Sequence, residues 1–155
     1  MKVSIVGAAL GAVVCATALW AADAPAQKPQ EIADGREATM KKLAATFKAA
    51  ADPAATQTDA RAKLSDAIKI AESIPSLFPK GSGIGDPGIM HSRALQDIWA
   101  KPKEFKAAAD ALVTALKAAD AAVASGDKAQ AGPAFGGVGR ACKTCHDAFR
   151  GPDTE

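Results

Sequence analysis

The sequence predicts an all-α protein that folds as an antiparallel four-helix bundle. Apolar residues make up 48% of the 155 residues but aromatic residues only 5%, and the abundant alanine favours helix while burying little area per side chain. Four stretches place their larger apolar residues three or four positions apart, which is the spacing of a helix face, and no stretch reads as a strand. Two short connections and one long connection are typical of antiparallel neighbours. An irregular all-helical fold is the alternative.

Caps and helix breakers delimit the four expected helices. They run from about 31 to 51, 59 to 73, 102 to 124 and 128 to 150. Gly132, Pro133 and three further glycines up to position 139 weaken the last helix, so we expect it to start late or to bend. The connection over residues 75–99 is dense in glycine and proline. Loops of this length within a compact domain are usually functional or mobile.

The N-terminus has the layout of a secretory signal peptide. A lysine at position 2 precedes an uncharged apolar run, and small residues follow as far as Ala26. We expect cleavage after Ala26, with Ala21 and Ala22 as competing positions. Residues 1–26 would then be removed, and residues 27–155 would form one soluble domain in the periplasm.

Export and charge narrow the function further. Cys15 leaves with the signal peptide, so two cysteines remain in a compartment where disulfides are permitted. The net charge is +2 at pH 7, and removal of the signal takes away one charge of each sign. A charge so close to balance excludes nucleic acid as the expected partner.

The motif Cys-Lys-Thr-Cys-His at residues 142–146 carries the chemistry. On a helix, Cys142, Cys145 and His146 share a face because residues three and four positions apart are neighbours. Two thiols on this face can add to the two vinyl groups of a porphyrin, while the imidazole binds the iron from the same side. This spacing is the haem-attachment signature. A single motif predicts one covalent haem c, attached to the C-terminal helix.

Three other kinds of site fit the motif less well. A thioredoxin-like pair should head a helix that follows a strand, and no strand is expected here. A structural zinc site needs four ligands, and His91 is the one other candidate. A simple disulfide would leave the adjacent His146 unexplained.

The chain resembles the class II c-type cytochromes, the cytochrome c-prime (c') family. The resemblance covers nearly all of residues 27–155. It is carried by the motif in the last helix followed by Phe149 and Arg150, and by the spacing of Arg36 and Met40 in the first helix. The segments Leu77-Phe78-Pro79 and Ile98-Trp99 around the long loop also match. The resemblance implies a four-helix bundle, and cytochrome c' is itself one of the standard examples of that fold.

The resemblance also implies roles for residues outside the motif. Met40 occupies the position of the family residue that faces the distal side of the haem. Arg36 occupies the position of a family arginine that binds a haem propionate. Arg150 matches an arginine on the proximal side, and Phe78 is a candidate for packing on the haem edge. Each role has an alternative. Met40 could be a gap-filling core residue, and Arg36 a surface arginine whose stem packs on the protein. Arg150 could be a cation that stabilises the helix end, and Phe78 an ordinary core residue.

Two functions follow from the two roles of Met40. If its thioether binds the iron, as in the Met-ligated low-spin members of the family, the haem is six-coordinate and suits electron transfer with redox partner proteins. If it only packs beside the haem, the iron is five-coordinate and can bind nitric oxide or carbon monoxide. Met90 and His91 are rival ligands from the long loop. We expect no enzyme activity, and either a monomer or a homodimer.

Overall fold

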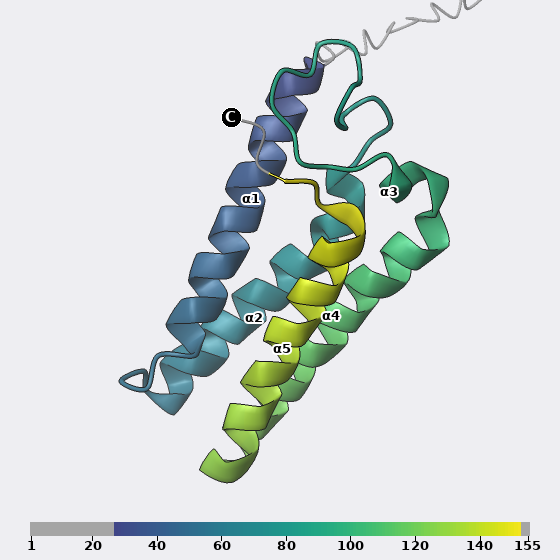
Figure 1. Cartoon of the computed structure of the whole chain (residues 1–155). Coiled ribbons are helices and arrows are strands. Elements are labelled where there is room, and N and C mark those ends of the chain that lie inside the picture. The colour runs from purple at the N-terminus through teal and green to yellow at the C-terminus, as the bar shows by residue number, and fades with distance from the viewer. Residues whose placement is uncertain (1–26, 153–155) are drawn as a thin grey trace, which may run out of the picture.

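Four long helices form the bundle in the computed structural model, which describes residues 27–152 (Figure 1). Residues 1–26, which include the expected signal peptide and its cleavage site, lie outside the described part. The long helices are α1 (Pro29–Ala50), α2 (Gln57–Ser73), α4 (Pro102–Ala124) and α5 (Lys128–Phe149), and two short helices, η1 (Ile74–Leu77) and α3 (Asp97–Ala100), flank the long connection. The all-α four-helix prediction is therefore confirmed.

The helix ends follow the capping signals in the sequence. The Thr56 side chain accepts a hydrogen bond from the Asp59 N–H at 3.1 Å and so begins α2. Asp127 accepts from the Ala129 N–H at 2.8 Å and so begins α5 at once, with Pro133 inside the helix. The helix therefore begins at the expected position 128, and the late start suggested by its glycines does not occur, because the Asp127 cap compensates for weak helix formers in the first turns.

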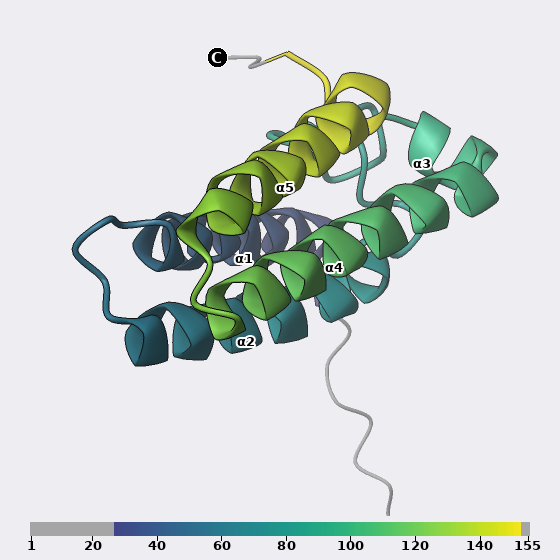
Figure 2. The ribbon, with the colours of Figure 1, turned by 90° about the horizontal axis from the view of Figure 1, so that it is seen from below.

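The four helices pack in a fixed order around one apolar core. α4 packs against both α2 and α5, and α1 packs against α2, whereas α1 and α5 make few close backbone approaches along their described lengths. Figure 2 shows this arrangement from below, with α5 lying above α1 in the view. Leu64 of α2 and Leu116 of α4 are 0% exposed and mark the centre of the core. Among the neighbouring pairs of long helices in the described residues, α1 and α5 therefore have the least backbone packing between them.

Aromatic side chains set the register between α1 and α5. The rings of Phe47 and Phe135 lie with their centroids 5.7 Å apart. Phe47 lies in the last turn of α1 and Phe135 in the first half of α5. The two helices run in opposite directions (Figure 1). The ring contact fixes which residues of the two helices lie at the same level further along the bundle.

The long connection covers the end of the bundle where α1 begins and α5 ends (Figure 1). Gly81, Gly85 and Gly88 adopt positive φ angles, which side-chain-bearing residues rarely adopt. Trp99 of α3 donates its indole N–H to the Phe78 carbonyl at 3.0 Å and so holds the loop closed. Within residues 27–152 the one β-type pairing is an isolated bridge, and no helix there is long and apolar enough to cross a membrane.

Candidate haem site

Cys142 and Cys145 lie on α5 as two free thiols on one face of the helix. Both are half-buried and pack against the apolar core. Burial raises the pKa of each thiol, which keeps them protonated and is the opposite of what a reactive redox pair requires. Within the described residues, no group of three or more His, Cys, Asp or Glu could hold a metal ion by itself. The geometry therefore supports neither a redox pair nor a zinc site.

His146 follows directly on the same helix and presents an exposed imidazole. Burial of part of the ring lowers the pKa of His146, and the positive charges of Arg150 and Arg93 lower it further, while Asp147 opposes them. A lowered pKa keeps the imidazole neutral at neutral pH, which is the form that binds a metal. Among residues 27–152, no hydrogen bond or ion pair holds this side chain, so its nitrogens are available to a ligand.

Met40 lies on α1 at the level of the cysteine motif. It is seven residues before Phe47, and Cys142 is seven residues after Phe135. Because the helices are antiparallel and rise about 1.5 Å per residue, both residues lie roughly 10 Å from the Phe47–Phe135 contact in the same direction. Met40 is half-buried and packs against the same apolar cluster as Cys142 and Cys145.

Arg36 lies one helical turn before Met40 and is only 7% exposed, so it is no surface arginine. Its guanidinium donates to the Leu77 carbonyl, the Ser82 hydroxyl and carbonyl, and the Ser92 hydroxyl, at 2.8 to 3.4 Å. No carboxylate of the described residues forms an ion pair with it. A buried guanidinium that lacks an anionic partner in the protein is suited to accept a carboxylate from a ligand.

Phe78 connects Arg36 to the apolar core. The Arg36 guanidinium carbon lies 4.6 Å from the centroid of the Phe78 ring. That ring meets Phe105 edge-on at 4.9 Å, and Phe105 in turn meets Phe149 of α5 at 5.3 Å. Phe78 is half-buried, so one part of the ring packs in the core and the other part remains open to a neighbour.

The loop residues Met90 and His91 are held away from the motif. The Gln30 amide oxygen accepts the backbone N–H groups of both, at 2.7 and 3.0 Å, and the Gln30 amide nitrogen donates to the His91 carbonyl at 3.0 Å. Gln30 lies ten residues before Met40, which is roughly 15 Å along α1. The Met90 side chain is 77% exposed. Gln30 was not among the residues expected to matter, and no sequence signal marked it.

These residues fit a covalent haem. Two unpaired thiols one turn apart face the apolar core beside an available neutral imidazole. A thioether lies at the same level on the opposing helix, a buried guanidinium without an anion lies one turn away, and α1 and α5 have little backbone packing between them. The residues that could hold the group are Cys142, Cys145, His146, Met40, Arg36 and Phe78.

Comparison with known proteins agrees with this geometry. The family model for cytochrome c' matches residues 26–150. The cytochrome c' of Rhodospirillum rubrum is 31% identical over 153 residues, which cover 97% of this chain and 99% of that one. The chain belongs to the cytochrome c' family. It is therefore a monohaem c-type cytochrome that carries covalent haem c.

Solved structures extend the agreement to the fold. The crystal structure of the Rubrivivax gelatinosus cytochrome c' has a TM-score of 0.67 and 30% identity, covering 80% of this chain and 98% of that one. A nitric oxide complex of a cytochrome c' variant from Alcaligenes xylosoxidans has a TM-score of 0.68 and 25% identity, with 81% and 98% coverage.

In this cytochrome c', Arg150 lies just beyond the last helix rather than within it. Its backbone is extended, its N–H bonds the His146 carbonyl at 3.0 Å, and it pairs with Ala94 in the isolated bridge. The Lys41 side chain lowers the pKa of Glu37 on α1, and the positive charge of Arg150 adds a smaller effect in the same direction. The positive charge of Arg93, in the long loop, helps to lower the pKa of His146. Sequence reasoning missed Arg93, whose one signal is that it is the only arginine of the glycine-rich connection.

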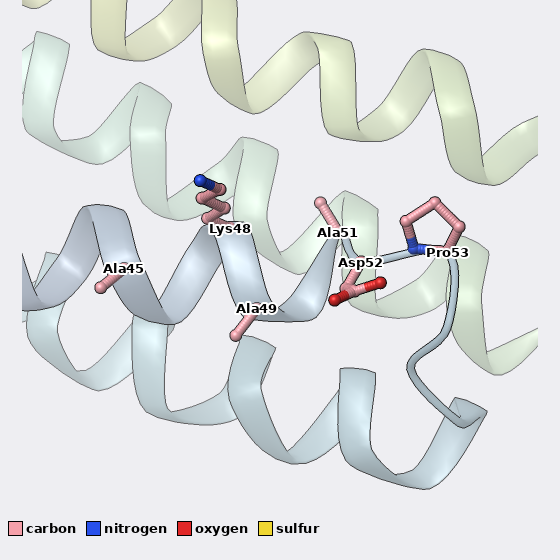
Figure 3. A pocket seen from close by; sticks show the side chains of 6 residues that line it. All are labelled: Ala45, Lys48, Ala49, Ala51, Asp52 and Pro53. Atoms are coloured by element: carbon pink, nitrogen blue, oxygen red, sulfur yellow. The ribbon is translucent and has the colours of Figure 1, made fainter.

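A surface hollow elsewhere on this cytochrome c' carries no comparable chemistry. Figure 3 shows it at the C-terminal end of α1 and the start of the following turn. Alanine side chains and Pro53 supply most of its lining, with Lys48 and Asp52 as the polar residues. Its lining offers no thiol, imidazole or thioether, so it is not part of the candidate haem site.

Proposed function

We propose that the chain is a periplasmic electron carrier whose single haem is attached by Cys142 and Cys145 and bound at the iron by His146 and Met40. The observation that carries this proposal is the level of Met40, which lies across from Cys142 on the facing helix. Met40 packs against the same cluster as both cysteines. Met90, the other methionine of residues 27–152, is held at the surface through Gln30.

Attachment needs the thiol chemistry that this helix presents. Each thiol adds across one vinyl group of the porphyrin, so that a carbon–sulfur bond forms and the thiol proton moves to the other vinyl carbon. The two sulfurs come from positions three apart on one helix face, and His146 follows on that face. His146 binds metal through a neutral ring nitrogen. When bound, the haem iron supplies the one-electron chemistry.

The remaining site residues orient the group. We propose that Arg36 binds a propionate, in addition to its hydrogen bonds to Ser82 and Ser92, because it is a buried cation without a carboxylate among the described residues. Phe78 would pack on the haem edge with the part of its ring that the core leaves open. Arg150 would lie on the proximal side, because it follows His146 by four residues and its positive charge helps to lower the pKa of His146.

The test is the visible spectrum of the purified protein, oxidised and reduced, with and without carbon monoxide. We expect low-spin spectra that carbon monoxide does not change. Met40→Leu keeps the volume and apolar character of the side chain but removes the sulfur. It should convert the spectrum to high-spin and make it respond to carbon monoxide. Met90→Leu is the matched control and should leave the spectrum unchanged.

The second candidate function is binding of a small gas at a five-coordinate iron. It is favoured by the solved nitric oxide complex of a variant of the Alcaligenes xylosoxidans cytochrome c'. In this case Met40 would only pack near the distal side, as half-buried methionines commonly do. A wild-type spectrum that is already high-spin and shifts with carbon monoxide would decide for this function and against Met40 as a ligand.

Export also belongs to the proposal. We propose that residues 1–26 direct secretion and are removed, which leaves residues 27–155 as the mature domain in the periplasm. The mass of the purified protein checks both points at once. It should equal residues 27–155 plus one haem, whereas cleavage after Ala21 or Ala22 would add the intervening residues.

A further inference from the structure

The end of α5 is joined to the long loop by a tight backbone junction. The Leu95 N–H donates to the Phe149 carbonyl at 3.1 Å, and the Gly151 N–H donates to the Arg93 carbonyl at 2.8 Å. Gly151 is buried, and a Cβ there would lie 2.9 Å from Ile84 Cδ1 and 3.3 Å from Leu95 Cδ2. The loop can therefore approach the helix end closely because position 151 has no side chain.

The junction also fixes a side chain. The Nε of half-buried Arg93 donates to the Gly151 carbonyl at 2.9 Å, so backbone and side chain of this residue bind the same glycine. Gly151 comes directly after Arg150, whose N–H bonds the His146 carbonyl. The guanidinium of Arg93 is thus held at the end of α5 by a hydrogen bond to a residue 58 positions away in sequence. Its positive charge helps to lower the pKa of His146.

We infer that Arg93 is a positioning residue whose guanidinium, held at the end of α5, adds to the positive charge of Arg150 near the proximal imidazole and thereby favours the reduced haem. The inference rests on the proposed role of His146 as iron ligand. Oxidised haem carries one more positive charge than reduced haem, so a nearby fixed cation disfavours the oxidised state. Asp147, the nearest acidic residue on α5, acts in the opposite direction and is exposed and paired with Lys143.

The experiment is a redox titration of the holoprotein with charge-changing variants. Arg93→Gln should lower the midpoint potential, so that the ratio of reduced to oxidised protein at a fixed potential falls about three- to tenfold. That range corresponds to about 28 to 59 mV for a one-electron couple. Raising the salt concentration should diminish the difference, because part of the side chain is reached by solvent ions.

Two further variants separate charge from structure. Arg93→Lys keeps the positive charge but loses the planar Nε hydrogen bond to Gly151, and it should retain most of the wild-type potential. Lys48→Gln removes one positive charge at the far end of α1 (Figure 3) and should leave the potential unchanged. Equal shifts in the Lys and Gln variants of Arg93 would mean that the residue acts only through the junction, and would overturn the inference.

Failure of the inference and failure of the proposed function have different signatures. If Arg93→Gln shows the wild-type spectrum and the wild-type potential, the inference is wrong and the proposed ligation stands. If the wild-type protein itself lacks a His-ligated c-type spectrum, the proposed function is wrong, and the role of Arg93 falls with it.

Discussion

The guanidinium of Arg36 binds Ser82 twice, with Nη1 donating to the hydroxyl at 2.9 Å and Nη2 donating to the carbonyl at 2.8 Å. Ser82 is 1% exposed and lies in the long loop, and its hydroxyl donates in turn to the Pro79 carbonyl at 2.8 Å. One side chain of the first helix therefore holds the loop that covers this end of the bundle. Arg36 therefore both holds the conformation of the loop and belongs to the candidate haem site.

Replacement of Arg36 should destabilise the protein strongly. Arg36→Leu removes the side-chain donor to the Leu77 carbonyl and leaves the Ser82 carbonyl with only the long 3.4 Å hydrogen bond from the Ser92 hydroxyl. We expect a loss of about 3 kcal/mol in the free energy of unfolding. Urea denaturation measures it. The matched control is Arg61→Leu, which breaks an exposed ion pair with Asp120 and should cost much less. Similar losses for the two variants would contradict a central role for Arg36.

Glycine at position 83 is required by the approach of Trp99. A Cβ there would lie 2.4 Å from Trp99 Cζ3 and 3.0 Å from the Ala94 carbonyl. Gly83→Ala should therefore displace the indole and cost about 1 to 3 kcal/mol. Trp99 is the one tryptophan of residues 27–155, so near-UV circular dichroism reports its displacement directly.

Replacement of Gly35 by alanine should raise the stability of the protein, whereas the same replacement at Gly83 should lower it. Gly35 lies inside α1, and a Cβ there would meet nothing within 4 Å. Gly35→Ala should stabilise the protein by about 0.5 to 1 kcal/mol, because alanine loses less backbone entropy in a helix. A destabilised Gly35→Ala protein, or an unaffected Gly83→Ala protein, would show that local space does not govern these positions.

The cap of α5 makes stability depend on pH. Hydrogen bonds from the Gln130 side chain and the Ala129 N–H hold the pKa of Asp127 below its ordinary value of 3.8. A lowered carboxyl pKa adds stability that is present above the ordinary value and is lost as pH falls through the folded-state pKa. Asp127→Asn keeps a capping side chain that does not titrate.

The comparison of these two proteins isolates the Asp127 contribution. The urea midpoint of the wild type should exceed that of Asp127→Asn by a constant amount near neutral pH, and the difference should shrink at pH below about 4. Contributions of all other carboxylates cancel between the two curves. A difference that does not change with pH would rule out titration of this cap.

The Gln30 amide should protect the loop from proteolysis. Gln30→Ala removes the acceptor of the Met90 and His91 N–H groups and the donor to the His91 carbonyl. We expect faster cleavage near these residues, because local opening becomes easier where backbone hydrogen bonds are lost. Limited proteolysis followed by mass spectrometry locates the cut. The neighbouring variant Glu31→Ala, which leaves the Gln30 amide intact, should be cut at the wild-type rate.

Periodicity and spacing predicted most of the fold. The expected bounds of 102 to 124 for the third long helix are those of α4, because proline in the first turn and Ser125-Gly126 after the last mark both ends. The long irregular connection was also predicted, from its glycine and proline content. Its two short helices were not, since four-residue elements depend on contacts such as that of Trp99 with Phe78 rather than on a repeating pattern.

The site was predictable where chemistry depends on local spacing. Cys142, Cys145 and His146 follow from one short motif on one helix. The partners of Arg36 and the position of Arg93 could not be predicted, because they depend on how a glycine-rich loop returns to residues more than forty positions away. Met40 was expected on the buried face of its helix, and it is half-buried because α1 has little backbone packing against α5.

The opposition of α1 and α5 has a consequence for the order in which the molecule assembles. These are the first and last helices of the chain, and bringing Phe47 to Phe135 closes a loop that contains every other element. Such closure costs more entropy and comes later than pairing of helices that are neighbours in sequence. Few direct contacts between α1 and α5 offset this entropy cost, so a haem attached to α5 would provide the surface against which α1 packs. Attachment of the haem would then precede completion of the fold.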